Sequence, residues 1–165
     1  MIDRFKLSDA EELYGFMNLP EIREFIPDRF ENKNDLVNVL DWLIGNYSLE
    51  KDKVVRISLA IREKGSGDFI GWVTYGPLPY DEELKEIGFA IDPVYWNLGY
   101  ATLAGEKFLE WVRNNVTEEA VYAEVDERNV KSQRVLEKLG FSKVKEDRIH
   151  RDKTEKNIWI YRWDG

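Results

Sequence analysis

The stretch Glu86 to Ala104, EIGFAIDPVYWNLGYATLA, contains a strand, a short loop and the beginning of a helix. The strand pattern stops at Asp92 and Pro93, and after Gly99 apolar residues recur at helical spacing. The first amides of a helix have no acceptor inside it, so they face outward with the positive end of the helix dipole. The stretch therefore predicts an anion site suited to phosphate, and the alternative is that Gly99 only turns the chain and Ala101 only packs. It is neither a P-loop nor a dinucleotide fingerprint, because the residues that define those motifs are missing.

Working outward from this stretch, the periodicity predicts an α/β (α+β) fold in which a mixed, twisted sheet is flanked by about four helices. About seven strands are expected, at residues 2–7, 54–62, 69–75, 84–91, 121–125, 141–147 and 157–163. Helices are expected at residues 8–18, 36–47, 99–115 and 129–139, with a loop that could hold one helical turn at 19–33. The order is then β-α-α-β-β-β-α-β-α-β-β.

The organisation of the chain predicts a single domain over residues 1–165, because no linker, repeat or low-complexity tract divides it. The crossover from 84 to 125 predicts two nearly parallel neighbouring strands. In open α/β sheets the ligand crevice lies at the carboxyl ends of such strands, which is where the 92–99 loop belongs.

Composition excludes several classes of protein. The 165 residues include no Cys and one His, which argues against disulfides, thiol catalysis and a catalytic metal site. A net charge of -8 argues against nucleic-acid binding and mildly favours a cationic partner. No apolar run is long enough to cross a membrane, and the N-terminal residues lack a leader pattern, so we expect no membrane contact and a cytoplasmic protein.

Two motifs resemble those of one enzyme family. The first motif begins with Glu86-Ile87-Gly88-Phe89 and ends with Asp92-Pro93-x-Tyr-Trp-Asn-x-Gly-Tyr-Ala-Thr102. The second motif is Asn129-x-x-Ser-Gln-Arg-Val-Leu-Glu-Lys-Leu-Gly-Phe141. In order and spacing they resemble the GCN5-related N-acetyltransferases (GNAT), and most closely the RimJ/RimL-like branch that acetylates ribosomal-protein N-termini. The resemblance extends over essentially the whole chain and implies an acetyl-CoA-dependent N-acetyltransferase.

The resemblance also implies how acetyl-CoA is held. Its pyrophosphate would bind the loop Trp96, Asn97, Leu98, Gly99, Tyr100, Ala101 and Thr102, mainly through backbone amides. Its pantetheine arm would lie along the strand residues Phe89, Ala90 and Ile91 and would bond to Asn129 and Ser132. For Asn129 and Ser132 the alternative is simple helix capping. Trp96 replaces the Gln or Arg of the wider family, and Trp is usual in the RimJ/RimL-like branch.

Glu86 is the candidate base for deprotonating the amine, because it shares a strand face with Gly88 and Ala90 and matches a catalytic Glu of the family. The alternative is a structural ion pair with Arg56 or Arg62. Many members place an acidic Tyr where this chain has Leu136, so protonation of the leaving thiolate falls to water, Ser132 or another Tyr such as Tyr100. With no Cys and no Ser-His pair, direct transfer is expected.

The acceptor is expected to be a primary amine: a protein α-amino group, a polyamine or a small amino compound. Acidic residues between the first two helices, Glu24 and Asp28 among them, favour a cationic acceptor, and Trp72 and Tyr75 are candidate pocket residues. The alternative for the acidic residues is a solvated surface. A homodimer is possible from the family. The rival function is a non-catalytic acyl-CoA-binding module or sensor.

Overall fold

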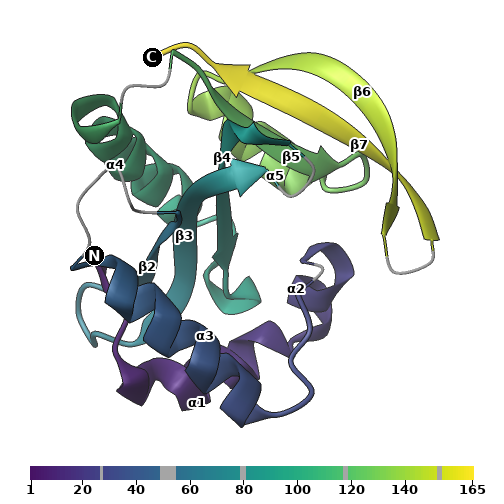
Figure 1. The fold of residues 1–165 in the computed structure, drawn as a ribbon. Coiled ribbons are helices and arrows are strands. Elements are labelled where there is room, and N and C mark those ends of the chain that lie inside the picture. Colours follow the sequence, from purple (N-terminus) through teal and green to yellow (C-terminus); the bar gives the residue numbers. More distant parts are fainter. Residues whose placement is uncertain (27, 49–54, 79–80, 117–118, 152–153) are drawn as a thin grey trace.

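The computed structural model describes residues 1–26, 28–48, 55–78, 81–116, 119–151 and 154–165 (Figure 1). Its strands are β1 (Ile2–Arg4), β2 (Ile57–Arg62), β3 (Phe69–Leu78), β4 (Asp81–Ile91), β5 (Val121–Asp126), β6 (Ser142–Arg151) and β7 (Thr154–Trp163). Its α-helices are α1 (Ala10–Met17), α2 (Pro20–Phe25), α3 (Lys33–Asn46), α4 (Tyr100–Asn115) and α5 (Val130–Lys138), and two 3₁₀ turns are η1 (Leu7–Asp9) and η3 (Pro93–Tyr95).

One mixed sheet contains all seven strands, in the order β1-β2-β3-β4-β5-β7-β6. The pair β4–β5 is parallel and the other five neighbouring pairs are antiparallel. This confirms the predicted α/β fold and the parallel crossover through α4. The β6–β7 hairpin is longer than expected and extends as a curved arm on the same side of the molecule as α2 (Figure 1).

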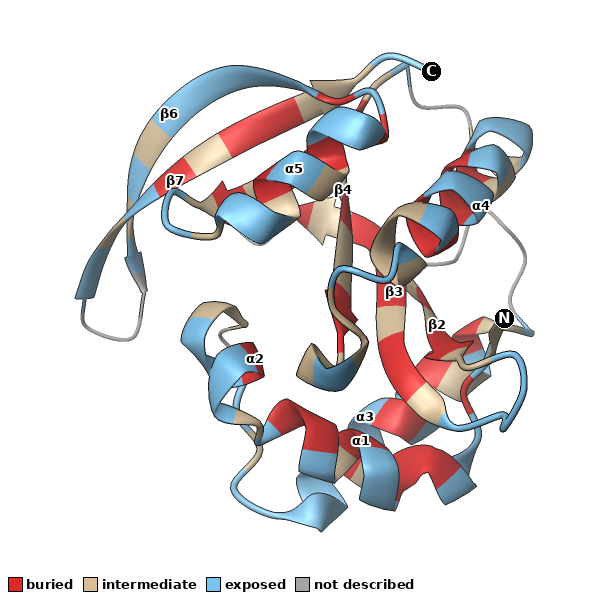
Figure 2. Ribbon diagram, turned by 180° about the vertical axis from the view of Figure 1, so that it is seen from behind, coloured by how far each residue is buried: buried red, intermediate tan, exposed pale blue. Residues whose placement is uncertain are grey.

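Helices cover both faces of the sheet, with α1 and α3 on one side and α4 and α5 on the other (Figure 2). Alternation along β4 serves both layers: Ile87 and Ile91 belong to the core beneath α4 and α5, whereas Ala90 belongs to the core beneath α1 and α3. In the described part of the chain no helix is both long and apolar enough to cross a membrane.

The N-terminal helical region differs from its prediction. The segment expected as a loop with one helical turn contains α2, which begins with Pro20 at its first turn and buries Ile22. The first α-helix begins at Ala10 and follows the 3₁₀ turn η1. Asp9 closes that turn, since its carboxylate accepts from the Lys6 amide (2.9 Å) and from Arg62 (2.7 Å). Val54, the expected start of β2, lies outside the described residues.

Close packing of α4 against α5 depends on Gly105. A Cβ at this position would lie 2.5 Å from Leu139 Cδ1, so we expect Gly105→Ala to lower the free energy of unfolding by about 1 kcal/mol despite the better helix propensity of Ala. The matched control is Gly15→Ala in α1, where a Cβ would meet nothing within 4 Å. There the propensity gain stands alone, and stability should rise by up to about 1 kcal/mol. Urea unfolding of both variants measures the change in the free energy of unfolding, which should be negative for Gly105→Ala and positive for Gly15→Ala. Equal changes in the two variants would contradict the packing argument.

Candidate active site

Strands β4 and β5 part after a single pairing. Among the described residues, Glu86 pairs with Tyr122 and no later residue of β4 pairs with β5, although β4 continues to Ile91 and β5 to Asp126. The backbone of β4 beyond Glu86 therefore has a free edge on this side. A cavity of about 520 Å³ lies here, lined by both strands, by α5 and by the helices α1 to α3. It lies at the carboxyl-terminal half of the two parallel strands, as expected.

Glu86 lies on the floor of the cavity, with its side chain 17% exposed. Its Oε1 is 3.8 Å from Arg56 Nη2, so of the two ion pairs considered as the structural alternative, the one with Arg56 is present, although it is long. Arg56 also donates to the Pro77 carbonyl (2.9 Å) and to Thr74 Oγ1 (3.4 Å). The guanidinium fits because Gly76 has no side chain: a Cβ there would lie 2.9 Å from Arg56 Cζ. Glu86 is thus held from one side by Arg56 and borders the cavity.

A second glutamate, Glu124, also lines the cavity and was missed from the sequence. The pairing of Glu86 with Tyr122 places alternate residues of β5 on the same sheet face as Glu86, and Glu124 is one of them. The inward alternation of Val121, Ala123 and Val125 already implied that Glu124 faces away from the α4 side. The register between β4 and β5, which places Glu124 close to Glu86, could not be predicted from the sequence.

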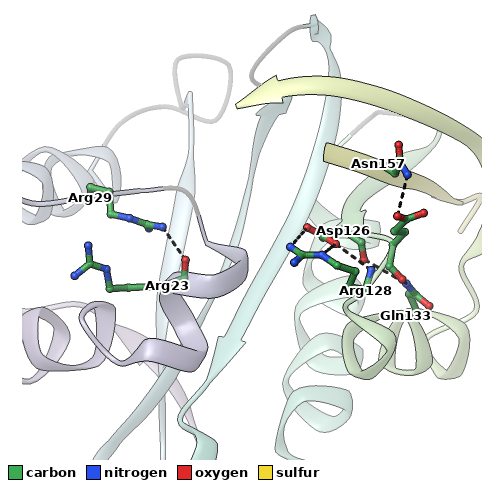
Figure 3. A network of polar contacts seen from close by, with 7 residues as sticks. Arg23, Arg29, Asp126, Arg128, Gln133 and Asn157 are labelled. Carbon is green, nitrogen blue, oxygen red and sulfur yellow. Dashed lines mark hydrogen bonds and ion pairs between the residues drawn. The ribbon is translucent and has the colours of Figure 1, made fainter. Parts of the chain in front are cut away.

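Asp126, at the end of β5, is tied to Arg128 by two side-chain bonds of 2.8 and 2.9 Å (Figure 3). Burial acts to raise the pKa of this carboxyl, but hydrogen bonds from the Arg128 side chain and amide outweigh it, and the pKa is lowered. Asp126 is therefore ionised at neutral pH, and it orients the Arg128 guanidinium toward the Phe25 ring of α2, at 5.7 Å from the ring centroid. This contact joins α2 to the loop between β5 and α5.

The beginning of α5 borders the same cavity through Asn129, Ser132 and Leu136. Asn129 caps the helix, because its side-chain oxygen accepts from the Ser132 amide at 3.2 Å. Leu136 is 2% exposed and occupies the position where the resemblance described above leads one to expect an acidic Tyr. An apolar side chain there supplies no proton to the cavity.

Two local hydrogen bonds shape the loop after β4. Asp92 caps the 3₁₀ turn η3 by accepting from the Val94 amide (2.9 Å), and Trp96 Nε1 donates back to the Ile91 carbonyl (2.7 Å). Lys131 Nζ lies 3.7 Å from the centroid of the Trp96 ring. These contacts fix the loop between the end of β4 and the first turn of α5.

Six consecutive amides follow, from Asn97 to Thr102, and in the described part of the chain none of them donates to a backbone or side-chain acceptor. Asn97 and Gly99 both have left-handed backbone angles, with φ of 63° and 84°, which turns the loop into the start of α4. An array of free amides at the beginning of a 16-residue helix is the arrangement that binds phosphate.

The structure brings some of the predicted site residues together and leaves others apart. Those that line the cavity are Glu86, Phe89, Asn129, Ser132, Asp28 and Trp72. Ala90 and Ile91 are buried beside it on β4, and residues 96 to 102 form the amide loop at the end of that strand. Two candidates lie elsewhere: Tyr75 is buried in the core on the α4 side, and Glu24 is exposed and does not line the cavity.

Residues that follow α2 also line the cavity: Ile26, Asp28, Arg29 and Phe30. Arg29 donates to the carbonyl of Arg23 in α2 (2.7 Å, Figure 3) and to the carbonyls of Asp28 (2.9 Å) and Ile26. Its charge is thus directed at backbone oxygens of its own segment. Among the described residues no group of three or more acidic or His side chains is arranged to hold a metal ion.

Residues 1–142 match the profile of the acetyltransferase (GNAT) domain. A curated relative, the uncharacterized N-acetyltransferase YjdG of Bacillus subtilis (strain 168), is 29% identical over 104 residues, which cover 63% of this chain and 58% of that protein. The chain thus spans less than two thirds of this relative.

Solved structures give the same fold. The ribosomal-protein-S5-alanine acetyltransferase from Vibrio fischeri superposes with a TM-score of 0.81 at 19% identity, covering 99% of this chain and 91% of that one. The Microcin C7 self-immunity acetyltransferase MccE, in complex with acetyl-CoA and AMP, superposes with a TM-score of 0.79 at 18% identity, covering 99% and 91%. At these identities the likeness shows the fold alone.

Proposed function

The chain belongs to the acetyltransferase (GNAT) family, and we propose that it transfers the acetyl group of acetyl-CoA directly to a primary amine, with residues 1–165 acting as one catalytic domain. The observation that carries this proposal is the parting of β4 from β5 next to the free amides of residues 97 to 102. A strand edge and an anion site in continuation of one another suit a long cosubstrate with an amide-containing arm and a pyrophosphate.

In the proposed complex the amides of Asn97 to Ala101 hold the pyrophosphate, and the free edge of β4 at Phe89, Ala90 and Ile91 pairs with the pantetheine arm. Asn129 and Ser132 also line the cavity, which supports the proposal that they bond the pantetheine amides. The Asn129 side-chain oxygen already caps α5, so its NH₂ group is the part that can donate to a ligand. The solved complex of MccE with acetyl-CoA supports this choice of cosubstrate.

The chemical step needs a neutral amine. At pH 7 an alkyl amine with a pKa of about 10.4 is neutral in roughly one molecule in 2,500, whereas an α-amino group with a pKa of about 7.7 to 8.0 is neutral in roughly one in ten. We propose that the Glu86 carboxylate accepts the proton from the ammonium. The amine nitrogen then attacks the thioester carbonyl and the C–N bond forms. As the C–S bond breaks to release the CoA thiolate, the nitrogen gives up a second proton to become the amide, and this proton passes through water or Ser132 to the thiolate.

Protonation of the thiolate is assigned to water or to Ser132. Leu136 supplies no proton. Tyr100 does not line the cavity, and its hydroxyl lies 3.5 Å from Glu63 Oε1. A thiol with a pKa of about 8.5 leaves readily, so a general acid helps without being required.

We further propose that the chain belongs to the RimJ/RimL-like branch and that its acceptor is the amine of a protein N-terminus. The fold that it shares with the ribosomal-protein-S5-alanine acetyltransferase supports this proposal. The decisive measurement is thiol release from acetyl-CoA in the presence of a panel of amines and N-terminal peptides, with mass spectrometry of the acetylated product. Binding of acetyl-CoA without release for any acceptor would instead identify the rival function, a non-catalytic acyl-CoA-binding module.

The hydrogen bond from Trp96 to the Ile91 carbonyl gives a test of the amide loop. We expect Trp96→Phe to raise the KM for acetyl-CoA about threefold to tenfold, because one net hydrogen bond contributes about 1 kcal/mol to the loop geometry. Trp111→Phe, which makes the same change on α4 away from the loop, is the control and should leave this KM unchanged. An unaltered KM in Trp96→Phe would mean that the loop keeps its shape without the bond.

A further inference from the structure

The part of the cavity beneath the helices is apolar. We call this part the helix-side wall, and it consists of Met17, Phe25, Ile26, Phe30, Val39 and Trp42. Asp28 and Arg29 are the charged side chains that the same N-terminal segment adds to the lining, and the Arg29 guanidinium is bonded to backbone carbonyls; the sheet side adds Arg56, Glu86, Glu124 and Asp126. Of the two acidic residues predicted for the acceptor site, Asp28 lines the cavity and Glu24 does not.

Two residues of the helix-side wall are exposed although they are large and apolar. Trp42 is 48% exposed and Val39 is 39% exposed, and they lie three residues apart on α3. Leu36 and Leu40 on the same helix are almost completely buried. A single exposed apolar residue is ordinary, but these two border a cavity, and a molecule inside the cavity would cover them.

The helix-side wall is continuous with the proposed catalytic end of the cavity. Trp72 connects the two parts, because it packs with the α1 and α3 core and lies over β4: a Cβ on Gly88 would be 3.6 Å from its ring. Glu86, Gly88 and Trp72 all line the same cavity as Trp42. An amine delivered to Glu86 would thus have the rest of its molecule against apolar side chains.

We propose that the acceptor is a primary amine that carries an aromatic or branched apolar group within a few bonds of its nitrogen, and that Trp42 and Val39 contact this group. The proposal rests on the proposed acetyl transfer and specifies its substrate class. A polyamine that extended along the helix-side wall would place its additional ammonium groups against apolar side chains, where they would lose water; the carboxylates of Glu86, Glu124 and Asp126 line the sheet side of the cavity. A free amine and a peptide N-terminus with an apolar first residue share the required chemistry.

The first test compares acceptors that differ in one group. Thiol release is measured with 2-phenylethylamine against ethylamine, with phenylalaninamide against glycinamide, and with spermidine. We expect kcat/KM to be at least about tenfold higher for each apolar member of a pair, the discrimination that an apolar pocket typically gives. A tripeptide that begins with Phe, compared with phenylalaninamide, separates a peptide source from a free amine.

The second test changes the helix-side wall. Trp42→Gln should remove most of the preference for phenylalaninamide over glycinamide through a higher KM for phenylalaninamide, without raising the KM for acetyl-CoA. Leu103→Gln, at a residue that is 52% exposed on α4 and outside the cavity, is the matched control. Thermal unfolding checks that Trp42→Gln folds, and Val39→Asp serves in its place if it does not.

The outcomes separate the two proposals. Faster turnover of spermidine, ethylamine or glycinamide than of the apolar acceptors would overturn the proposed substrate class and leave acetyl transfer standing. An unchanged preference in the Trp42 variant would exclude the helix-side wall as its cause. No thiol release with any amine, although acetyl-CoA binds, would overturn the proposed function and with it the substrate class.

Discussion

A Glu86→Gln variant is expected to lose about 10² to 10⁴ in kcat/KM at pH 7, because the neutral amide cannot accept the proton of the acceptor ammonium. The loss should shrink as the pH rises toward the pKa of the amine, since more of the amine is then already neutral. At neutral pH the loss should also be larger for an alkyl amine than for an α-amino group. The measurement is kcat/KM against pH for 2-phenylethylamine and phenylalaninamide.

The structural alternative for Glu86 predicts a different result. If Glu86 only pairs with Arg56, which lies 3.8 Å away, Glu86→Gln should lower the melting temperature and leave the shape of the pH profile unchanged. Glu124→Gln is the matched control, because Glu124 is the same residue type on the neighbouring strand and lines the same cavity. A larger loss in Glu124→Gln than in Glu86→Gln would transfer the role of base to Glu124.

An Asn97→Asp variant is expected to raise the KM for acetyl-CoA about tenfold to a hundredfold. Asn97 carries the first of the free amides, so the change places a negative charge beside the proposed pyrophosphate site with almost no change in size. Two like unit charges about 6 to 12 Å apart near a protein surface repel each other by about 1.4 to 2.7 kcal/mol, which corresponds to this range. The left-handed backbone of Asn97 is also tolerated by Asp.

Folding should survive this change, because a carboxylate near the beginning of α4 interacts favourably with the helix dipole. The control is Asn114→Asp, which makes the same substitution at an exposed position near the other end of α4. It should leave the KM for acetyl-CoA unchanged. Added salt should reduce the effect of Asn97→Asp, and an equal KM for the two variants would show that the amides of this loop do not hold the phosphates.

Local pattern was sufficient for much of this protein. The alternation along β2 to β5 and the helical spacing after Gly99 predicted the sheet, the crossover and α4, because each element has to bury one face. Prediction was less accurate for the elements whose structure depends on long-range contacts. Asp9 closes the first turn, and it is bound there by Arg62, a residue far along the chain. The six residues of α2 are too short for a periodic signal, and burial of Ile22 supports them.

The candidate site divides in the same way. The sequence by itself determined the amide loop, since Asp92, Pro93 and Gly99 act through local backbone geometry and the motif around them identified the family. Only the tertiary structure decided that β4 and β5 part after Glu86, that Glu124 shares the cavity while Tyr75 does not, and that Trp42 stands beside it. Strand register and the packing of distant helices depend on contacts between segments far apart in the chain, which periodicity within one segment does not encode.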